Sequence, residues 1–142
     1  MNLIDITILL FVILESTNIF ILYFKPDFKY GNSVSVFKHF EETKKDENLH
    51  LFIKYLVNWV ANVKLMFISF LIITVIFGSN QFKLYTLMAC LLSTLIYYIS
   101  LAPIIKKLDN NNYINPKGYS KVLNLMILSF ITIFSICLII HL

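Results

Sequence analysis

The sequence has no arginine, and it is poor in the residues that interrupt or cross-link a chain. It holds three glycines, three prolines and two cysteines in 142 residues. So few breakers predict long regular elements, and two cysteines without a CxxC spacing exclude a disulfide framework. A nucleic-acid interface favours a basic face that includes arginine, but every basic residue here is a lysine. Nucleic acid is therefore not expected as a partner.

Charged residues are also scarce, at 14% of the chain against 58% hydrophobic residues. Soluble domains have about 25% charged and about 45–50% apolar residues. With a mean hydropathy of +0.78, the composition is typical of a membrane protein. The opening residues, MNLID, lack the positive charge of a signal peptide, so the first apolar run is expected to remain as a helix. No glycine-rich phosphate loop is present, and no cofactor is expected.

Four apolar runs are long enough to cross a membrane, since a hydrocarbon core of about 30 Å needs about 20 helical residues. They predict an all-α, polytopic membrane protein: a single four-transmembrane-helix bundle over residues 1–142. The expected spans are residues 3–24, 54–77, 82–105 and 121–141. Asp46 is a suitable N-cap, so the second helix is expected over residues 47–77 and projects beyond the membrane. Pro103 should kink or end the third.

Two polar connections join the spans. In the first, residues 33–45 place Val34, Phe37 and Phe40 on one side and charged residues on the other. This pattern predicts a short amphipathic cytoplasmic helix, on the membrane surface or against the bundle; a solvated loop is the alternative. In the second connection, Asn115 followed by Pro116 predicts the N-cap and first residue of the last helix.

Two histidines of the first connection have the spacings His39-x-x-Glu42 and Glu47-x-x-His50. Glu-x-x-His motifs bind metal in di-iron helix bundles, but those sites also need carboxylates that project into the bundle core. This region is mostly solvated. We expect ordinary exposed histidines and no metal site.

The lysines are distributed unevenly along the chain. The first connection and its edge carry Lys25, Lys29, Lys38, Lys44, Lys45 and Lys54, and the second carries Lys106, Lys107, Lys117 and Lys121. The positive-inside rule therefore predicts that both long connections are cytoplasmic and both termini lie outside. A composition rich in Ile, Asn, Lys and Phe is typical of an AT-rich bacterial genome, so we expect the cell (inner) membrane.

Two charged residues fall deep inside the expected spans. A lysine at the centre of a spanning helix costs about 2.5–3.5 kcal/mol on insertion scales, so it usually has a partner. Lys64 and Glu15 each lie ten residues from a lysine at the same membrane boundary, Lys54 and Lys25 respectively. Both are then about 15 Å deep on adjacent antiparallel helices. We predict that they pair.

Three asparagines extend this polar region. Asn18 lies three residues after Glu15, on the same helix face. Asn58 and Asn62 fall on one stripe of the second helix, whereas Lys64 points to a different side. The buried polar candidates for a binding site are Glu15, Asn18, Asn58, Asn62 and Lys64. Two interpretations of the Glu15–Lys64 pair stay open: it serves a function, or it only fixes helix packing.

No catalytic constellation of serine, histidine and carboxylate is visible, and no enzyme is predicted. The favoured interpretation is a non-enzymatic binding or accessory subunit, with a buried polar site between the first two helices. Its expected partners are the lipid bilayer and another membrane protein or further copies of the chain.

The alternative is a small transporter. Four helices with one glutamate midway along the first resemble the small multidrug-resistance antiporters, which work as dimers. The resemblance covers this architecture and Glu15; the chain has longer connections and lacks the glycine-rich helices of that family. It implies a proton- or cation-coupled transporter that uses Glu15 and acts as an oligomer. Whether Glu15 faces a water-filled cavity or a lysine would distinguish the two functions.

Overall fold

The computed structural model describes residues 2–28 and 33–141, so Lys29 of the first connection lies outside the described residues. Its elements are α1 (Leu3–Phe24), the 3-10 helix η1 (Val34–Val36), α2 (Lys38–Thr43), α3 (Glu47–Phe77), α4 (Asn80–Ser100), α5 (Ala102–Asn110) and α6 (Tyr119–His141). Four helical stretches are long and apolar enough to cross a membrane, with α4 and α5 together forming one of them. The predicted all-α four-helix membrane bundle is confirmed.

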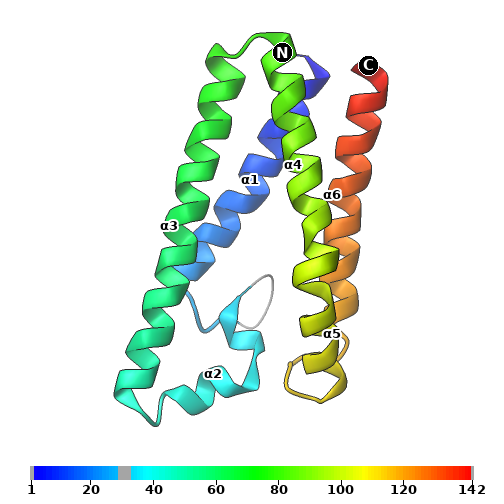
Figure 1. The fold of residues 1–142 in the computed structure, drawn as a ribbon. Helices are drawn as coiled ribbons and strands as arrows, with labels where there is room; N and C mark the ends of the chain where they lie inside the picture. Colours follow the sequence, from blue (N-terminus) through cyan, green and yellow to red (C-terminus); the bar gives the residue numbers. More distant parts are fainter. Residues whose placement is uncertain (1, 29–32, 142) are drawn as a thin grey trace.

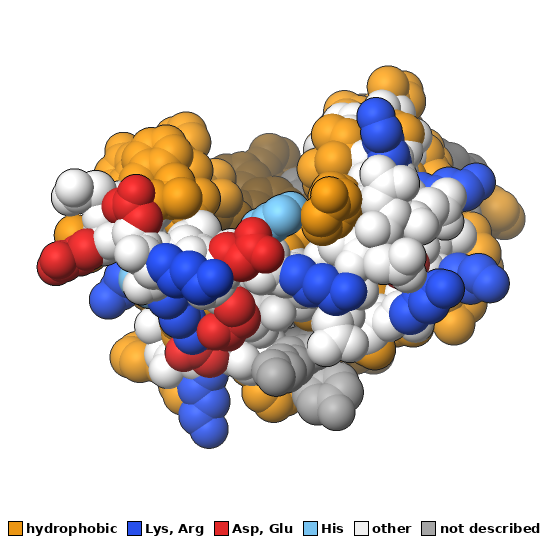
Figure 2. All heavy atoms as spheres, turned by 90° about the horizontal axis from the view of Figure 1, so that it is seen from below, with side chains coloured by type: hydrophobic (Ala, Val, Ile, Leu, Met, Phe, Trp, Pro, Cys, Tyr) orange, Lys and Arg blue, Asp and Glu red, His pale blue; other side chains and the backbone are white. Residues whose placement is uncertain are grey.

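The four long helices run between two ends of the molecule (Figure 1). The turn end carries both termini and the short turn at residues 78–79. The loop end carries the described parts of the two long connections, residues 25–28 and 33–46 of the first and residues 111–118 of the second. Helices α3 and α4 meet at the turn end and separate towards the loop end, where two lobes surround a hollow (Figure 2).

The helices pack mainly as two pairs, α1 with α3 and α4 with α6. The main core joins these pairs through fully buried side chains on all four helices: Ile8, Leu71, Leu87 and Phe134. Many apolar side chains on the outer faces are exposed, for example Met66, Phe77 and Ile99. Such apolar outer faces are expected where helices contact lipid instead of water.

Local sequence explains the helix ends at the turn end. Asn2 and Asp5 form a reciprocal capping box at the start of α1. Helix α3 ends at Phe77, as expected, and Gly78 follows it with φ −72°, which is not left-handed. A Cβ at this position would lie 2.4 Å from the carbonyl oxygen of Thr74. Glycine is needed here for close approach of the backbone.

The third long helix breaks at Leu101, two residues before Pro103. The predicted kink is confirmed, because a proline cannot donate the i→i−4 hydrogen bond and clashes with the preceding turn. The chain then resumes as α5 and runs to Asn110, beyond the expected span end at residue 105. Proline is tolerated there because it occupies the first turn of the new helix.

The predicted start of the last helix at Asn115 and Pro116 is wrong. Helix α6 begins at Tyr119, and its first turn is capped from another helix. The Asp109 carboxylate of α5 accepts hydrogen bonds from the backbone N–H groups of Gly118 and Ser120, at 2.9 and 3.0 Å. Gly118 has φ +86°, a left-handed conformation that favours glycine.

The first connection also differs from the single amphipathic helix expected over residues 33–45. It forms η1 and α2, which are separated at Phe37, and this residue forms a β-bridge with Ile114 of the second connection. Val36 and Phe40 are buried. Val36 packs in a second cluster with residues of α4, α5 and α6. The connection therefore ties the two helix pairs together at the loop end.

Candidate functional site

The predicted contact between Glu15 and Lys64 is present near the middle of the bundle. The Lys64 Nζ donates to a Glu15 carboxylate oxygen at 2.7 Å and to Asn18 Oδ1 at 2.6 Å. Glu15 and Asn18 lie on one face of α1 because they are three residues apart, and Lys64 reaches them from α3. The lysine thus has two polar partners, which reduces the cost of holding its charge away from water.

Asn62 of α3 also contacts α1, on the opposite side of the α1–α3 interface from Lys64. It accepts a hydrogen bond from the hydroxyl of Tyr23. Ala61 is fully buried, and a small residue allows two helices to approach closely. At 100° per residue, Asn62 and Lys64 lie about 100° and about −60° from Ala61 around α3. Both polar side chains therefore reach α1, although they point in different directions as predicted.

Asn58 is not brought to the ion pair. It is half-buried and lines a separate cavity of about 180 Å³ near the loop end, with His50 and Lys54. The five predicted site residues therefore divide into three groups. Glu15, Asn18 and Lys64 form one site, Asn62 contacts Tyr23 beside it, and Asn58 lies elsewhere.

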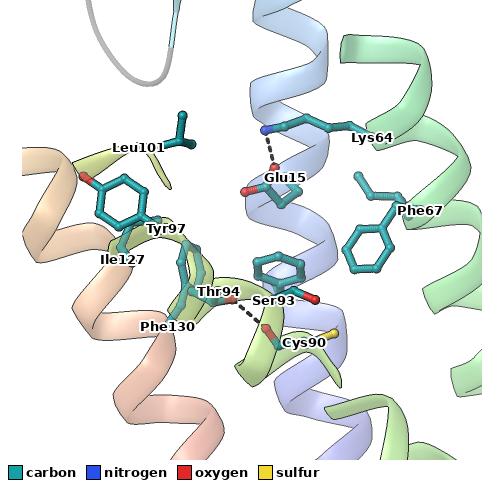
Figure 3. Close-up of a pocket in the computed structure, with 12 residues that line it drawn as sticks. Glu15, Lys64, Phe67, Cys90, Ser93, Thr94, Tyr97, Leu101, Ile127 and Phe130 are labelled. Carbon is teal, nitrogen blue, oxygen red and sulfur yellow. Dashed lines mark hydrogen bonds and ion pairs between the residues drawn. The ribbon is translucent and has the colours of Figure 1, made fainter. Parts of the chain in front are cut away.

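The ion pair forms part of the wall of a cavity of about 320 Å³ between the two helix pairs, here called the central cavity. Figure 3 shows Lys64 extending from α3 to Glu15 on α1, with Thr94 and Tyr97 of α4 across the space. The remaining wall is mostly apolar and includes three aromatic residues: Phe11, Phe67 and Phe130. Phe11 contacts each of the other two rings edge-on.

A second cavity of about 320 Å³ lies beside the pair towards the loop end. Asn18 and Lys64 line it together with Ser33, Val34 and Phe37 of the first connection. Lys64 lines both cavities. The polar group formed by Glu15, Asn18 and Lys64 therefore separates two mainly apolar spaces.

Sequence reasoning missed a second ion pair. Lys83 Nζ of α4 lies 2.7 Å from an Asp5 carboxylate oxygen of α1, and both side chains are only 10% exposed. The sequence did contain a signal for this pair. Asp5 lies at the start of the first span and Lys83 at the start of the third, and these two starts lie on the same side of the membrane because two spans separate them. The α4 side of the central cavity was also missed, because its hydroxyl residues fit ordinary helix-packing bonds equally well.

The histidines of the first connection have local partners. His39 contacts the Glu42 carboxylate, and this hydrogen bond holds the pKa of Glu42 below its usual value. His50 contacts the Thr43 hydroxyl at 3.0 Å. Hydrogen bonds to Asp27 and Glu41 raise the pKa of Lys44. Over residues 2–28 and 33–141, no three histidine, cysteine or carboxylate side chains are grouped to hold a metal ion.

Taken together, the central site offers one positive and one negative group at the edge of an aromatic cavity. Pockets for small molecules are typically about 300–1,000 Å³, mostly apolar, with a few polar groups that fix orientation. The central cavity has this size and this distribution of polarity. Comparison of the chain with models of known families, with curated proteins and with solved structures finds no match.

Proposed function

We propose that this multi-pass membrane protein is a non-enzymatic binding or accessory protein that holds a small amphipathic molecule in the central cavity. One observation carries the proposal: Glu15 and Lys64 line a cavity whose other walls are mostly apolar. An ion pair that lines a cavity keeps access to water or to a ligand and so avoids the full desolvation cost of an enclosed pair. Here a ligand's polar group would contact the pair and its apolar part would fill the aromatic space.

The test is a change of cavity volume without a change of charge. Thr94 lines the central cavity, so Thr94→Phe should fill it and abolish retention of a small molecule. Leu92→Phe is the matched control, because Leu92 lies on the same helix but is 64% exposed. Native mass spectrometry of each protein in mild detergent measures retention. Loss in Thr94→Phe alone is expected; equal retention by both variants and the wild type would contradict the proposal.

A proton- or cation-coupled transporter is the second candidate, because Glu15 both contacts Lys64 and lines the cavity. A Glu15 that faced either a cavity or a lysine was expected to distinguish the transporter from the binding protein. Because Glu15 contacts a lysine and also lines a cavity, this criterion does not separate the two functions. Flux measurements in proteoliposomes separate them. A transporter would carry protons or cations across the bilayer and lose this flux in Glu15→Gln, whereas a binding protein retains its ligand without flux.

We place the protein in a bacterial inner membrane with the loop end in the cytoplasm. The composition supports the choice of membrane, and the lysine distribution supports the orientation, because the described lysines other than Lys64 and Lys83 lie at or near the loop end. Cysteine labelling in intact cells tests it. Asn2→Cys should react with an impermeant reagent and Lys44→Cys should not; the reverse pattern would overturn the orientation.

A further inference from the structure

The two lobes of the loop end differ in charge. The lobe formed by α2 and the start of α3 carries acidic side chains among its lysines (Figure 2). The lobe formed by α5 and the start of α6 carries Lys106, Lys107, Lys117 and Lys121, with Asp109 as its acidic residue. Asp109 is buried, so the accessible surface of this second lobe is basic.

The Asp109 carboxylate forms no ion pair with these lysines among the described residues, although Lys117 interacts with it electrostatically. One oxygen accepts from the Gly118 N–H, and the other accepts from the backbone and hydroxyl of Ser120. These bonds cap α6 and occupy both oxygens. Lys106 and Lys121 have no ion-pair partner among the described residues.

The same two lysines line a cavity of about 380 Å³ between α4, α5 and α6, here called the basic cavity. Its other polar lining comes from Asn110, Ser120 and Asn124. Lysine ammonium and asparagine amide groups are hydrogen-bond donors. The basic cavity therefore collects two positive charges and several donors where α4 gives way to α5, at the boundary between the apolar spans and the loop end.

Tyr97 forms the inner wall of the basic cavity. The residue as a whole is 8% exposed, but its hydroxyl is not an enclosed atom, because no buried side-chain N or O atom of the described residues lacks a partner. No hydrogen bond joins this hydroxyl to residues 2–28 or 33–141, so it can bond to water or to a ligand. In Figure 3 the hydroxyl points away from the Glu15–Lys64 pair, which leaves it available to the basic cavity.

We propose that the basic cavity binds the phosphate of an anionic membrane phospholipid. Lys106 and Lys121 would contact the phosphate oxygens, and the Tyr97 hydroxyl would donate to the headgroup from the membrane side. Basic pockets next to transmembrane helices are known to select anionic headgroups. A lipid fits this position better than a soluble phosphate, because Ala102 and the Tyr97 ring give the cavity an apolar inner wall.

The experiment is lipid titration of the full chain in detergent, read by native mass spectrometry. The probes are phosphatidylglycerol, phosphatidylcholine with the same acyl chains, and inorganic phosphate. Each lysine near an anionic lipid contributes about fivefold to binding, so Lys106→Gln with Lys121→Gln should weaken phosphatidylglycerol binding by about 25-fold. Lys107→Gln with Lys117→Gln is the control, since it removes the same charge from the same lobe outside the cavity. Tyr97→Phe should weaken binding by a few-fold while keeping the ring.

The expected result is tight phosphatidylglycerol binding that the control pair retains and the cavity pair loses, with unchanged melting temperatures in lipid-free detergent. Equal loss in both pairs would show that diffuse charge attracts the lipid, and it would overturn the site. Equal binding of the two lipids would also overturn it. Phosphate that displaces phosphatidylglycerol at equal concentration would assign the cavity to a soluble anion instead. A melting temperature that falls only in the cavity pair would give the lysines a structural role and contradict the proposal.

Discussion

The two ion pairs that connect α1 to its neighbours have the same chemistry and length but different surroundings. Asp5–Lys83 and Glu15–Lys64 both join a carboxylate of α1 to a lysine at 2.7 Å. The side chains of the first pair are 10% exposed, and those of the second are 22% and 25% exposed for Glu15 and Lys64. The first pair is enclosed; the second lines the central cavity.

The other partners of each carboxylate explain this difference. Asp5 also accepts a hydrogen bond from the backbone N–H of Asn2 at 3.0 Å, in the capping box of α1. The capping box therefore holds the Asp5 carboxylate in position for its ion pair with Lys83. Asn2 in turn donates to Asn80 at the start of α4. Glu15 accepts no backbone hydrogen bond from residues 2–28 or 33–141, because it lies inside the helix. An enclosed pair held by a cap is suited to fixing geometry, whereas a pair beside a cavity is suited to contacting a ligand.

The largest expected effect is on the enclosed pair. Removing one partner of a buried ion pair typically costs about 3–5 kcal/mol, because the other charge stays buried alone. Asp5→Asn and Lys83→Met should each reduce the free energy of unfolding in detergent by this amount, and the double variant should lose less than either. Denaturant titration of the four proteins measures the coupling. Additive losses would show that the pair does not act as a unit.

A smaller effect is expected for the pair at the central cavity. Glu15→Gln or Lys64→Met leaves a charged group that the cavity can hydrate, so each should cost about 1–3 kcal/mol. The same titration measures both values. If Glu15→Gln also loses a retained small molecule while Asp5→Asn keeps it, the two pairs differ in ligand contact as well as in stability. A loss of stability as large as that of Asp5→Asn would remove the distinction between the two pairs.

The smallest effect is expected for an exposed pair at the loop end. The side chains of His39 and Glu42 are both 59% exposed. The His39 hydrogen bond lowers the pKa of Glu42 in the folded state, so its stabilisation is present above the unfolded pKa and is lost as pH falls through the folded pKa. Because solvent screens such pairs, Glu42→Gln should leave the melting temperature at neutral pH unchanged. A clear fall in the melting temperature, larger at neutral than at acid pH, would show that solvent exposure does not set the order of stability effects among the three pairs.

The sequence by itself determined the four spans and the contact between Glu15 and Lys64. Apolar runs fix helices in a membrane, because unsatisfied backbone groups are too costly in lipid, and Asp46 and Pro103 marked a helix start and a break. The contact between Glu15 and Lys64 followed from depth alone, since two charges at one level of neighbouring helices have few other partners. These features depend on local composition and on distance along a helix axis.

Only the tertiary structure decided the features that depend on how helices are rotated and splayed. The capping of α6 by Asp109, the bridge from Phe37 to Ile114 and the enclosure of Asp5 with Lys83 all join distant segments. The central cavity lies between the two helix pairs, which converge at the turn end and separate towards the loop end (Figure 1), whereas the basic cavity lies where α4 gives way to α5 beside α6. No apolar pattern encodes that angle, because it is set by side-chain packing across all four helices.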